Sequence, residues 1–193
     1  MIFRPFEEKD TEELILRVRQ NLTEGDPVVQ GIRDNVAIGN YFGGVAEEDG
    51  KFLGFATAKE GFEFTVPHPE LEKEIRDLFP GKRFFVGDQM WVSPEARGHG
   101  VAGRMLEITR QEVLARGGDY WLTELWVYPD GKSPVKDVAE GCGEKVFEKL
   151  VPMFYKDQDR YGLKCPICGD HCRCSAMVRV YHVTDREKEQ GNE

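Results

Sequence analysis

Residues 83–116 run from a strand pattern through a glycine-rich turn into a helix pattern, and they constrain the fold more than any other segment. The apolar and aromatic residues of 83–92 predict a buried strand, which Ser93 and Pro94 end. Residues 98–116 carry apolar side chains on one helical face, and two glycines follow. A strand that leads directly into a helix indicates a sheet with helices packed against it, so we expect an α/β or α+β protein.

The flanking segments add further elements of both kinds. Strand patterns cover residues 1–5, 41–47, 51–59, 120–128 and 176–183, with Asp49-Gly50 as a hairpin turn. One helix is predicted after Asp10 or Thr11, and others over 27–38 and 69–78. Residues 135–153 are predicted to be mostly helical, with a break or kink at Gly141-Cys142-Gly143.

The turn between the strand and the helix of 83–116 suits an anion. Gly98, Gly100 and Gly103 allow a ligand to approach the backbone closely. The first N–H groups of the following helix lack internal partners and lie at the positive end of its dipole. Arg97 and His99 can add donors. A glycine-rich turn alone would fit an ordinary surface turn equally well.

The sequence around this turn, MWVSPEARGHGVA from Met90 to Ala102, resembles the signature of the GNAT superfamily of acyl-CoA-dependent N-acetyltransferases. That signature is an apolar strand ending near Val-x-Pro, followed by Arg/Gln-x-x-Gly-x-Gly/Ala at the start of a helix. Arg97, Gly100 and Ala102 occupy its defining positions, and the Walker and dinucleotide patterns fit less well. The resemblance extends to residues 3–10, 125–130, 146–150 and 177–180, so it covers most of the chain.

The resemblance implies a mixed, twisted sheet of about seven strands flanked by helices, with the fourth and fifth strands splayed apart. Acyl-CoA would enter the gap, with its pantetheine arm along the fourth strand and its pyrophosphate on the turn. The implied cofactor-binding residues are Met90, Trp91, Val92, Arg97, Gly98, His99, Gly100, Val101, Ala102 and Gly103.

The implied activity is the transfer of an acetyl group from acetyl-CoA to a primary amine, by direct attack assisted by a general base. Asp88 is the first candidate for the base, because it interrupts an apolar strand. Counting with a period of two places it on one face with Met90 and Val92. A carboxylate that is exposed or paired with an arginine fits Asp88 equally well. Glu124, on the next strand, is the second candidate.

Two positions depart from the family pattern. Phe147 stands where many members place a tyrosine in a late helix to protonate the thiolate, and Gly131 stands where they often have asparagine. Tyr155 or Tyr128 could replace that tyrosine. These departures leave an alternative from another class, a non-catalytic CoA-binding, zinc-stabilised interaction or regulatory module.

Four of the five cysteines fall within residues 165–174. The spacing of Cys165, Cys168, Cys172 and Cys174 favours a closed structural zinc site, with His171 as an alternative ligand. Free thiols and an iron–sulfur cluster are the competing interpretations. The loop joins the last two predicted strands, a place that in many relatives lies near the acceptor side of the cleft. Cys142 stands apart and is expected to be a partly buried free thiol.

The length of 193 residues fits one acyltransferase domain over 1–193, with a cysteine-rich loop at 160–176 and a disordered tail at 185–193. A net charge of −9 argues against nucleic acid or an anionic membrane as partner and mildly favours a cationic acceptor. That acceptor would be a small-molecule amine or a protein or peptide amine. No apolar run suggests a signal peptide or a membrane span, so a cytoplasmic protein is expected, and a homodimer is left open.

Overall fold

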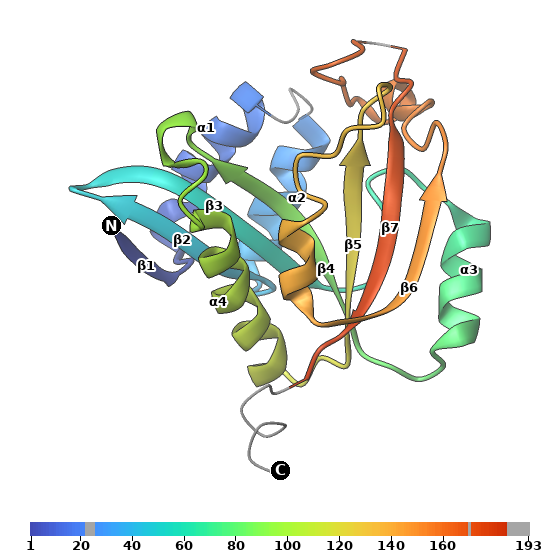
Figure 1. Cartoon of the computed structure of the whole chain (residues 1–193), viewed down its shortest axis with the longest axis horizontal. Helices are drawn as coiled ribbons and strands as arrows, with labels where there is room; N and C mark the ends of the chain where they lie inside the picture. The colour runs from blue at the N-terminus through green and yellow to red at the C-terminus, as the bar shows by residue number, and fades with distance from the viewer. Residues whose placement is uncertain (22–25, 170, 185–193) are drawn as a thin grey trace.

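The computed structural model describes residues 1–21, 26–169 and 171–184 (Figure 1). The tail predicted for 185–193 lies outside these residues. Within them, no helix combines the length and apolar character that crossing a lipid bilayer requires.

The sheet has seven strands in the order β1-β2-β3-β4-β5-β7-β6. Neighbouring strands are antiparallel except β4 and β5, which are parallel. The mixed seven-stranded sheet expected from the sequence is therefore confirmed. The strands are β1 Ile2–Pro5, β2 Tyr41–Glu48, β3 Lys51–Glu60, β4 Phe84–Val92, β5 Tyr120–Val127, β6 Glu144–Val151 and β7 Ser175–His182.

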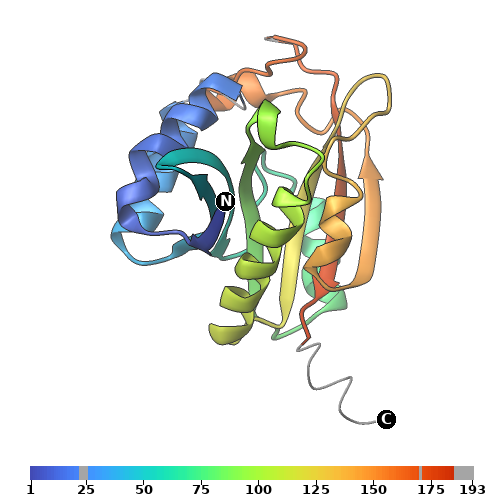
Figure 2. The same ribbon diagram turned by 60° about the vertical axis from the view of Figure 1, so that its left-hand side comes forward.

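Helices cover both faces of this sheet (Figures 1 and 2). The α-helices are α1 Thr11–Asn21, α2 Asp26–Ala37, α3 Pro69–Leu78 and α4 Val101–Ala115. Short 3-10 turns are η1 Glu8–Asp10, η2 Pro94–Ala96, η3 Val138–Cys142 and η4 Gln158–Tyr161. Helices α1 and α2 lie on one face of the N-terminal strands, and α4 lies on the other.

Helix α4 is fixed closely against β2 and β3, and this contact positions the turn at its N-terminus. A Cβ atom on Gly44 of β2 would lie 2.4 Å from the carbonyl oxygen of Met105, so only glycine permits the approach. The buried Thr109 hydroxyl accepts a hydrogen bond from Gly44 N at 3.2 Å and donates to Ala56 O at 2.9 Å. The helix therefore holds a defined place over the sheet.

Strands β4 and β5 pair only at their beginnings. Their register consists of Phe84 with Tyr120, Phe85 with Trp121 and Val86 with Leu122. Past Val86, β4 carries a β-bulge, where the register with β3 shifts between Ala56 and Ala58. A bulge bends a strand and increases its local twist, so β4 turns away from β5. The splay implied by the family resemblance is present.

The mostly helical structure predicted for residues 135–153 is wrong. Only the 3-10 turn η3 forms there, and the edge strand β6 follows it. A Cβ atom on Gly143 would lie 2.3 Å from His182 O, so glycine lets the chain join β7 here. Phe147 and Val151 then pack against the core cluster on the α3 side. Pairing with β7 and this burial override the helical propensity of the Glu, Lys and Leu residues of 144–150.

Candidate functional site

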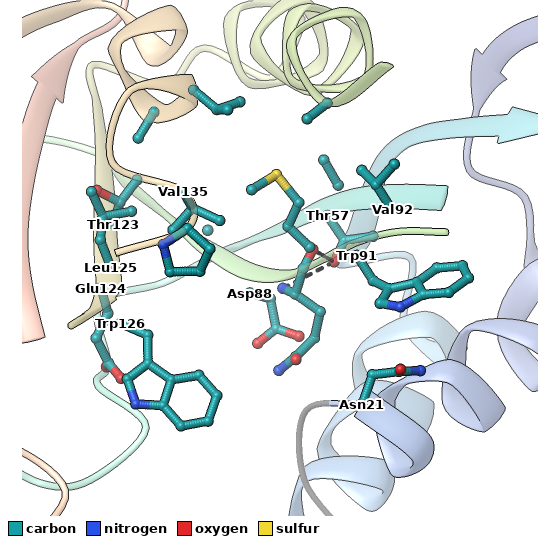
Figure 3. A pocket seen from close by; sticks show the side chains of 18 of the residues that line it. Asn21, Thr57, Asp88, Trp91, Val92, Thr123, Glu124, Leu125, Trp126 and Val135 are labelled. Atoms are coloured by element: carbon teal, nitrogen blue, oxygen red, sulfur yellow. Dashed lines mark hydrogen bonds between the residues drawn. The ribbon is translucent and has the colours of Figure 1, made fainter. Parts of the chain in front are cut away.

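A cleft of about 800 Å³ opens where β4 and β5 separate (Figure 3). One wall is the second half of β4, with the turn after it and the first residues of α4. The opposite wall is β5 with residues 134–142, and residues 163–167 of the loop between β6 and β7 close one end. The cleft thus joins the predicted anion site to the cysteine-rich loop.

The turn before α4 has the conformation that an anion site needs. Gly98 and Gly100 have φ angles of +77° and +73°, which favour glycine. The first helical hydrogen bond runs from Arg104 N to Gly100 O at 3.2 Å, so the amides of residues 101–103 precede it. Apart from neighbouring residues and the backbone of its own helix, no atom lies within 4 Å of a Cβ atom built on Gly103, which leaves space for a ligand.

Arg97 is tied to the end of β4, because its Nε donates to Val92 O at 3.1 Å. This contact keeps the guanidinium at the turn. The structure places every predicted cofactor-binding residue on the cleft lining except His99, whose exposed ring bonds to Arg97 O through Nδ1 at 2.8 Å. Residues 90–92 pair with β3 along one edge, and β5 does not pair with their other edge.

Asp88 lies in the cleft, but the face predicted for it is wrong. Met90 and Val92 pack on the core beneath α4, whereas Asp88 accepts a hydrogen bond from the Tyr41 hydroxyl, which belongs to the core on the α1 side. The β-bulge adds one residue to β4 opposite Thr57, whose hydroxyl bonds to both N and O of Gln89. This extra residue shifts the alternation, so the count by two fails.

The Asp88 carboxylate is held by two partners. The Tyr41 hydroxyl donates to Oδ2 at 2.7 Å, and Lys59 Nζ lies 3.4 Å from Oδ1. Burial of Tyr41, reinforced by the Asp88 charge, raises its phenol pKa well above the ordinary value. Burial opposes the charge of Lys59, but Asp88 and Glu63 outweigh it and raise the Lys59 pKa. Asp88 therefore faces a protonated phenol and an ammonium group.

Glu124 faces the same cleft from β5 (Figure 3). Its Oε2 accepts a hydrogen bond from Thr65 N at 2.9 Å, and the Tyr155 hydroxyl lies beside the carboxylate. No ion pair involves Glu124 within the described residues. Burial, with a smaller contribution from the charge of Asp88, raises the Glu124 pKa. A raised carboxyl pKa brings the group closer to that of an effective general base at neutral pH.

Buried polar atoms without a hydrogen-bond partner among the described residues gather around this cleft. They are Trp91 Nε1, Trp121 Nε1, Thr123 Oγ1, Trp126 Nε1 and Gln158 Nε2. The sequence analysis did not identify Gln158 and Thr123, or Thr65, whose N–H binds Glu124. These residues line the cleft because segments far apart in the chain meet there, so no local sequence motif indicates them.

Phe147 does not line the cleft. It lies on β6 in the core cluster on the α3 side, so its comparison with a tyrosine in a late helix does not hold. Gly131 sits in the turn after β5 with φ +83°, where Gly131 N donates to Tyr128 O at 2.9 Å. Tyr128 and Tyr155 both line the cleft.

The four clustered cysteines converge in the loop between β6 and β7. Their sulfur atoms all lie within 4.8 Å of one another, with Cys165 and Cys168 at 3.9 and 3.7 Å from Cys174. Four thiolates at about 2.3 Å from one zinc ion would be separated by about 3.8 Å in a tetrahedron. Cys168 N and Cys174 N also donate to the sulfur atoms of Cys165 and Cys172. These residues fit a four-thiolate zinc site.

His171 is exposed and does not belong to this group. Cys142 lies apart from it on η3, is 1% exposed and lines the cleft.

The cysteine group is continuous with the wall of the cleft. Three of its members belong to the same core cluster as Phe154 and Tyr155. The Trp126 indole lies beside Cys174, and its ring is 6.1 Å from the Tyr155 ring. Cys165 itself lines the cleft. A rigid cysteine site would therefore fix the end of the cleft where Glu124 lies.

Comparison with known proteins identifies a sequence match and a set of similar folds. Residues 7–143 match the model of the acetyltransferase (GNAT) family. A comparison with curated protein sequences gives no significant match.

Solved structures of this fold match nearly the whole chain. One is a chain of the NatC complex bound to Gag peptide and CoA, with a TM-score of 0.63, 15% identity and coverage of 95% of this chain and 98% of that one. Another is an aminoglycoside 6'-N-acetyltransferase complexed with coenzyme A, with a TM-score of 0.64, 12% identity and coverage of 96% and 99%. A third is NAA60 of Arabidopsis thaliana in complex with a bisubstrate analogue, with a TM-score of 0.61, 16% identity and coverage of 94% and 97%.

Proposed function

The chain belongs to the acetyltransferase (GNAT) family, and from this premise we propose that it transfers an acetyl group from acetyl-CoA to the nitrogen of a primary amine. One observation carries the proposal. A single cleft joins the start of α4, where the amides of residues 101–103 precede the first helical hydrogen bond, to two carboxylates on strands that separate past Val86. A long cofactor that ends in a thioester can span such a cleft.

Acetyl-CoA would lie with its pyrophosphate on the amides of residues 98–103. Arg97 adds a permanent positive charge there. The pantetheine arm would follow the edge of β4 that does not pair with β5, where the backbone of residues 90–92 offers donors and acceptors. Similar folds whose structures contain coenzyme A support this placement.

In the reaction, the lone pair of the neutral amine attacks the carbonyl carbon of the thioester. The carbon–sulfur bond breaks, the amine proton passes to a base directly or through water, and the CoA thiolate takes a proton from water. The contacts favour Glu124 as that base over Asp88. Glu124 has a raised pKa and forms no ion pair within the described residues, whereas Asp88 is held by Lys59 and Tyr41.

We propose that Asp88 supports the site structurally and electrostatically and is not the general base. Its charge contributes to the raised Glu124 pKa, and its contacts tie β4 to Lys59 of β3 and to Tyr41 of β2. The fixed position of the two substrates supplies much of the remaining rate.

We further propose that Cys165, Cys168, Cys172 and Cys174 hold one zinc ion. Four protein ligands close the coordination sphere, so the ion would have a structural role. It would stiffen the loop that carries Tyr155 and lines the acceptor end of the cleft. The convergence of the four sulfur atoms supports this site.

The test of the transferase proposal is release of CoA from acetyl-CoA, followed with a thiol reagent. The amine panel should span polyamines, aminoglycosides, amino acids, amino-acid amides and peptides with free N-termini. Release above the rate without amine, together with an acetylated product seen by mass spectrometry, is the expected result. Tight binding of CoA with no product from any amine would instead indicate a non-catalytic CoA-binding module.

A further inference from the structure

Gln158 lines the cleft with a buried side chain whose amide nitrogen has no hydrogen-bond partner among the described residues. It lies on η4 in the loop between β6 and β7, and it is 5% exposed. Its Nε2 has no hydrogen-bond partner in the part of the chain that the structure describes. Because leaving a buried donor unpaired costs about 1–3 kcal/mol, such a group on a cleft wall is suited to pair with a ligand.

The backbone holds Gln158 firmly in its turn. Gln158 N donates to Tyr155 O, and Leu163 N donates to Gln158 O, both at 3.1 Å. Leu163 and Tyr155 are buried in the core cluster that includes the cysteines. The side-chain amide is therefore carried by a fixed segment, and its position does not depend on a mobile loop tip.

Tyr155 relates Gln158 to Glu124. Its carbonyl oxygen accepts the hydrogen bond from Gln158 N, and its hydroxyl is beside the Glu124 carboxylate. Gln158, Tyr155 and Glu124 all line the cleft. The anion turn comes from a different element, the start of α4, so the acyl acceptor is the ligand expected at Gln158.

The Glu124 carboxylate and the Gln158 amide would each recognise a different chemical group of the acyl acceptor. A carboxylate base takes a proton from an amine. An amide N–H needs a hydrogen-bond acceptor, and a carbonyl oxygen serves it well. A simple polyamine offers protonated or neutral nitrogens but no carbonyl oxygen, and it would leave the Gln158 donor unpaired.

We propose that the acceptor is an α-amino carbonyl compound, such as an amino-acid amide or the N-terminus of a peptide, in which Gln158 Nε2 donates to the carbonyl oxygen next to the reacting amine. The inference rests on the proposed amine acetylation and names its class of substrate. Glu124 receives the amine proton, and Gln158 orients the carbonyl group beside it. Gln158 is therefore a residue that determines specificity.

The experiment compares two amines that differ only in the carboxamide, L-phenylalaninamide and 2-phenylethylamine. Values of kcat/KM with acetyl-CoA are measured for both amines in the wild-type protein and in Gln158→Leu. Dividing the amide-to-amine preference of the wild type by that of the variant cancels differences in amine basicity and intrinsic reactivity. We expect this quotient to be about three- to tenfold, the size of one hydrogen bond between neutral groups.

Two further variants keep the test independent of folding. Gln158→Glu has nearly the same shape but replaces the amide donor with a carboxylate, so it should lose the preference as well. Gln111→Leu alters an exposed glutamine on α4, whose Nε2 bonds to Glu107 Oε1, and should keep the preference. Affinity for CoA, measured by calorimetry, confirms that each variant is folded.

The outcomes separate this inference from the proposed function. If both amines release CoA but the quotient stays near one for both Gln158 variants, the acceptor class is wrong and amine acetylation stands. If neither amine releases CoA while a polyamine or aminoglycoside does, the acceptor class is likewise overturned. If no amine of any class releases CoA, the proposed function fails and the inference fails with it.

Discussion

The Tyr41 hydroxyl donates a 2.7 Å hydrogen bond to Asp88 Oδ2, although β2, which carries Tyr41, is two strands away from β4. The bond crosses β3 next to the β-bulge, where Tyr41 also meets the Thr57 hydroxyl at 2.9 Å. We expect a carboxylate bound in this way to stabilise the bend in β4 where the cleft opens. Asp88 is thus expected to support the site more than to take part in proton transfer.

Replacing Asp88 by Asn should therefore affect stability first. The change removes one of the two carboxylates that pair with the largely buried Lys59, and it weakens the hydrogen bond to the buried Tyr41 hydroxyl, so the free energy of unfolding should fall by about 1–3 kcal/mol. The turnover number should fall less than about tenfold in the fraction that is folded, because the base remains. Urea denaturation and acetyl-transfer kinetics measure the two effects. The matched control is Asp77→Asn, which breaks an exposed pair with Lys73. A stable variant that loses about a hundredfold or more in turnover would return the role of base to Asp88.

Arg97→Glu should weaken binding of acetyl-CoA by about tenfold or more. The substitution places a negative charge where the pyrophosphate would lie, while the exposed side chain contributes little to the core. Calorimetry gives the affinity and thermal unfolding gives the stability. Arg33→Glu reverses a similarly exposed arginine on α2, paired with Glu12, and should leave the affinity unchanged. Equal affinities for the two variants would mean that the phosphates do not lie at this turn.

The raised pKa of Glu124 predicts two opposite pH effects. Activity requires the carboxylate, so kcat/KM should rise with pH through a pKa above the ordinary 4.5 of glutamate. The free energy of unfolding should change in the opposite direction. At pH values between the pKa of Glu124 in the unfolded state and its higher pKa in the folded state, the folded protein binds more protons than the unfolded chain. The stability that Glu124 contributes is therefore fully present below the unfolded pKa and is lost as pH rises through the folded pKa. Relative to Glu124→Gln, the wild type should lose stability over that range, and denaturation at several pH values measures it. A difference that does not change with pH would show that the Glu124 pKa is not raised.

Removal of the metal should loosen one end of the cleft and leave the sheet folded. Elemental analysis of protein purified without added metal should find about one zinc per chain, and the Cys165→Ser/Cys168→Ser variant should lose it. A chelator should lower Tm without unfolding the protein, because the sheet has its own core. Binding of acetyl-CoA at Arg97 should survive, while acetyl transfer should fall. Protein without metal, with four titratable thiols in this loop and a Tm that the chelator does not change, would refute the zinc site.

Local signals in the sequence predict much of this fold. Arg97, Gly100 and Ala102 predict the turn before α4 because its backbone geometry depends on residues that are close in the chain. The hairpin of β2 and β3 follows from alternating strands around Asp49-Gly50. The cysteine spacing likewise predicts a group that the structure brings together. In each case the determining residues are close in the chain.

Failures arise where distant contacts decide the structure. Residues 144–151 contain good helix formers, yet their place beside β7 makes them a strand. A single bulge opposite Thr57 moves Asp88 to the other face of β4, and alternation alone cannot reveal a bulge. Gln158 reaches the cleft only because its turn packs with the cysteine loop, so no local pattern marks it.

The most direct test of the central claim is a single turnover of acetyl transfer by the wild type and by Glu124→Gln. Protein in excess is loaded with acetyl-CoA carrying a labelled acetyl group and mixed with an amine that the wild type acetylates, and the labelled product is followed by mass spectrometry. If Glu124 is the base in this cleft, the variant should bind acetyl-CoA as the wild type does and transfer the label about a hundredfold or more slowly. Transfer at the wild-type rate by a folded Glu124→Gln protein would contradict the account.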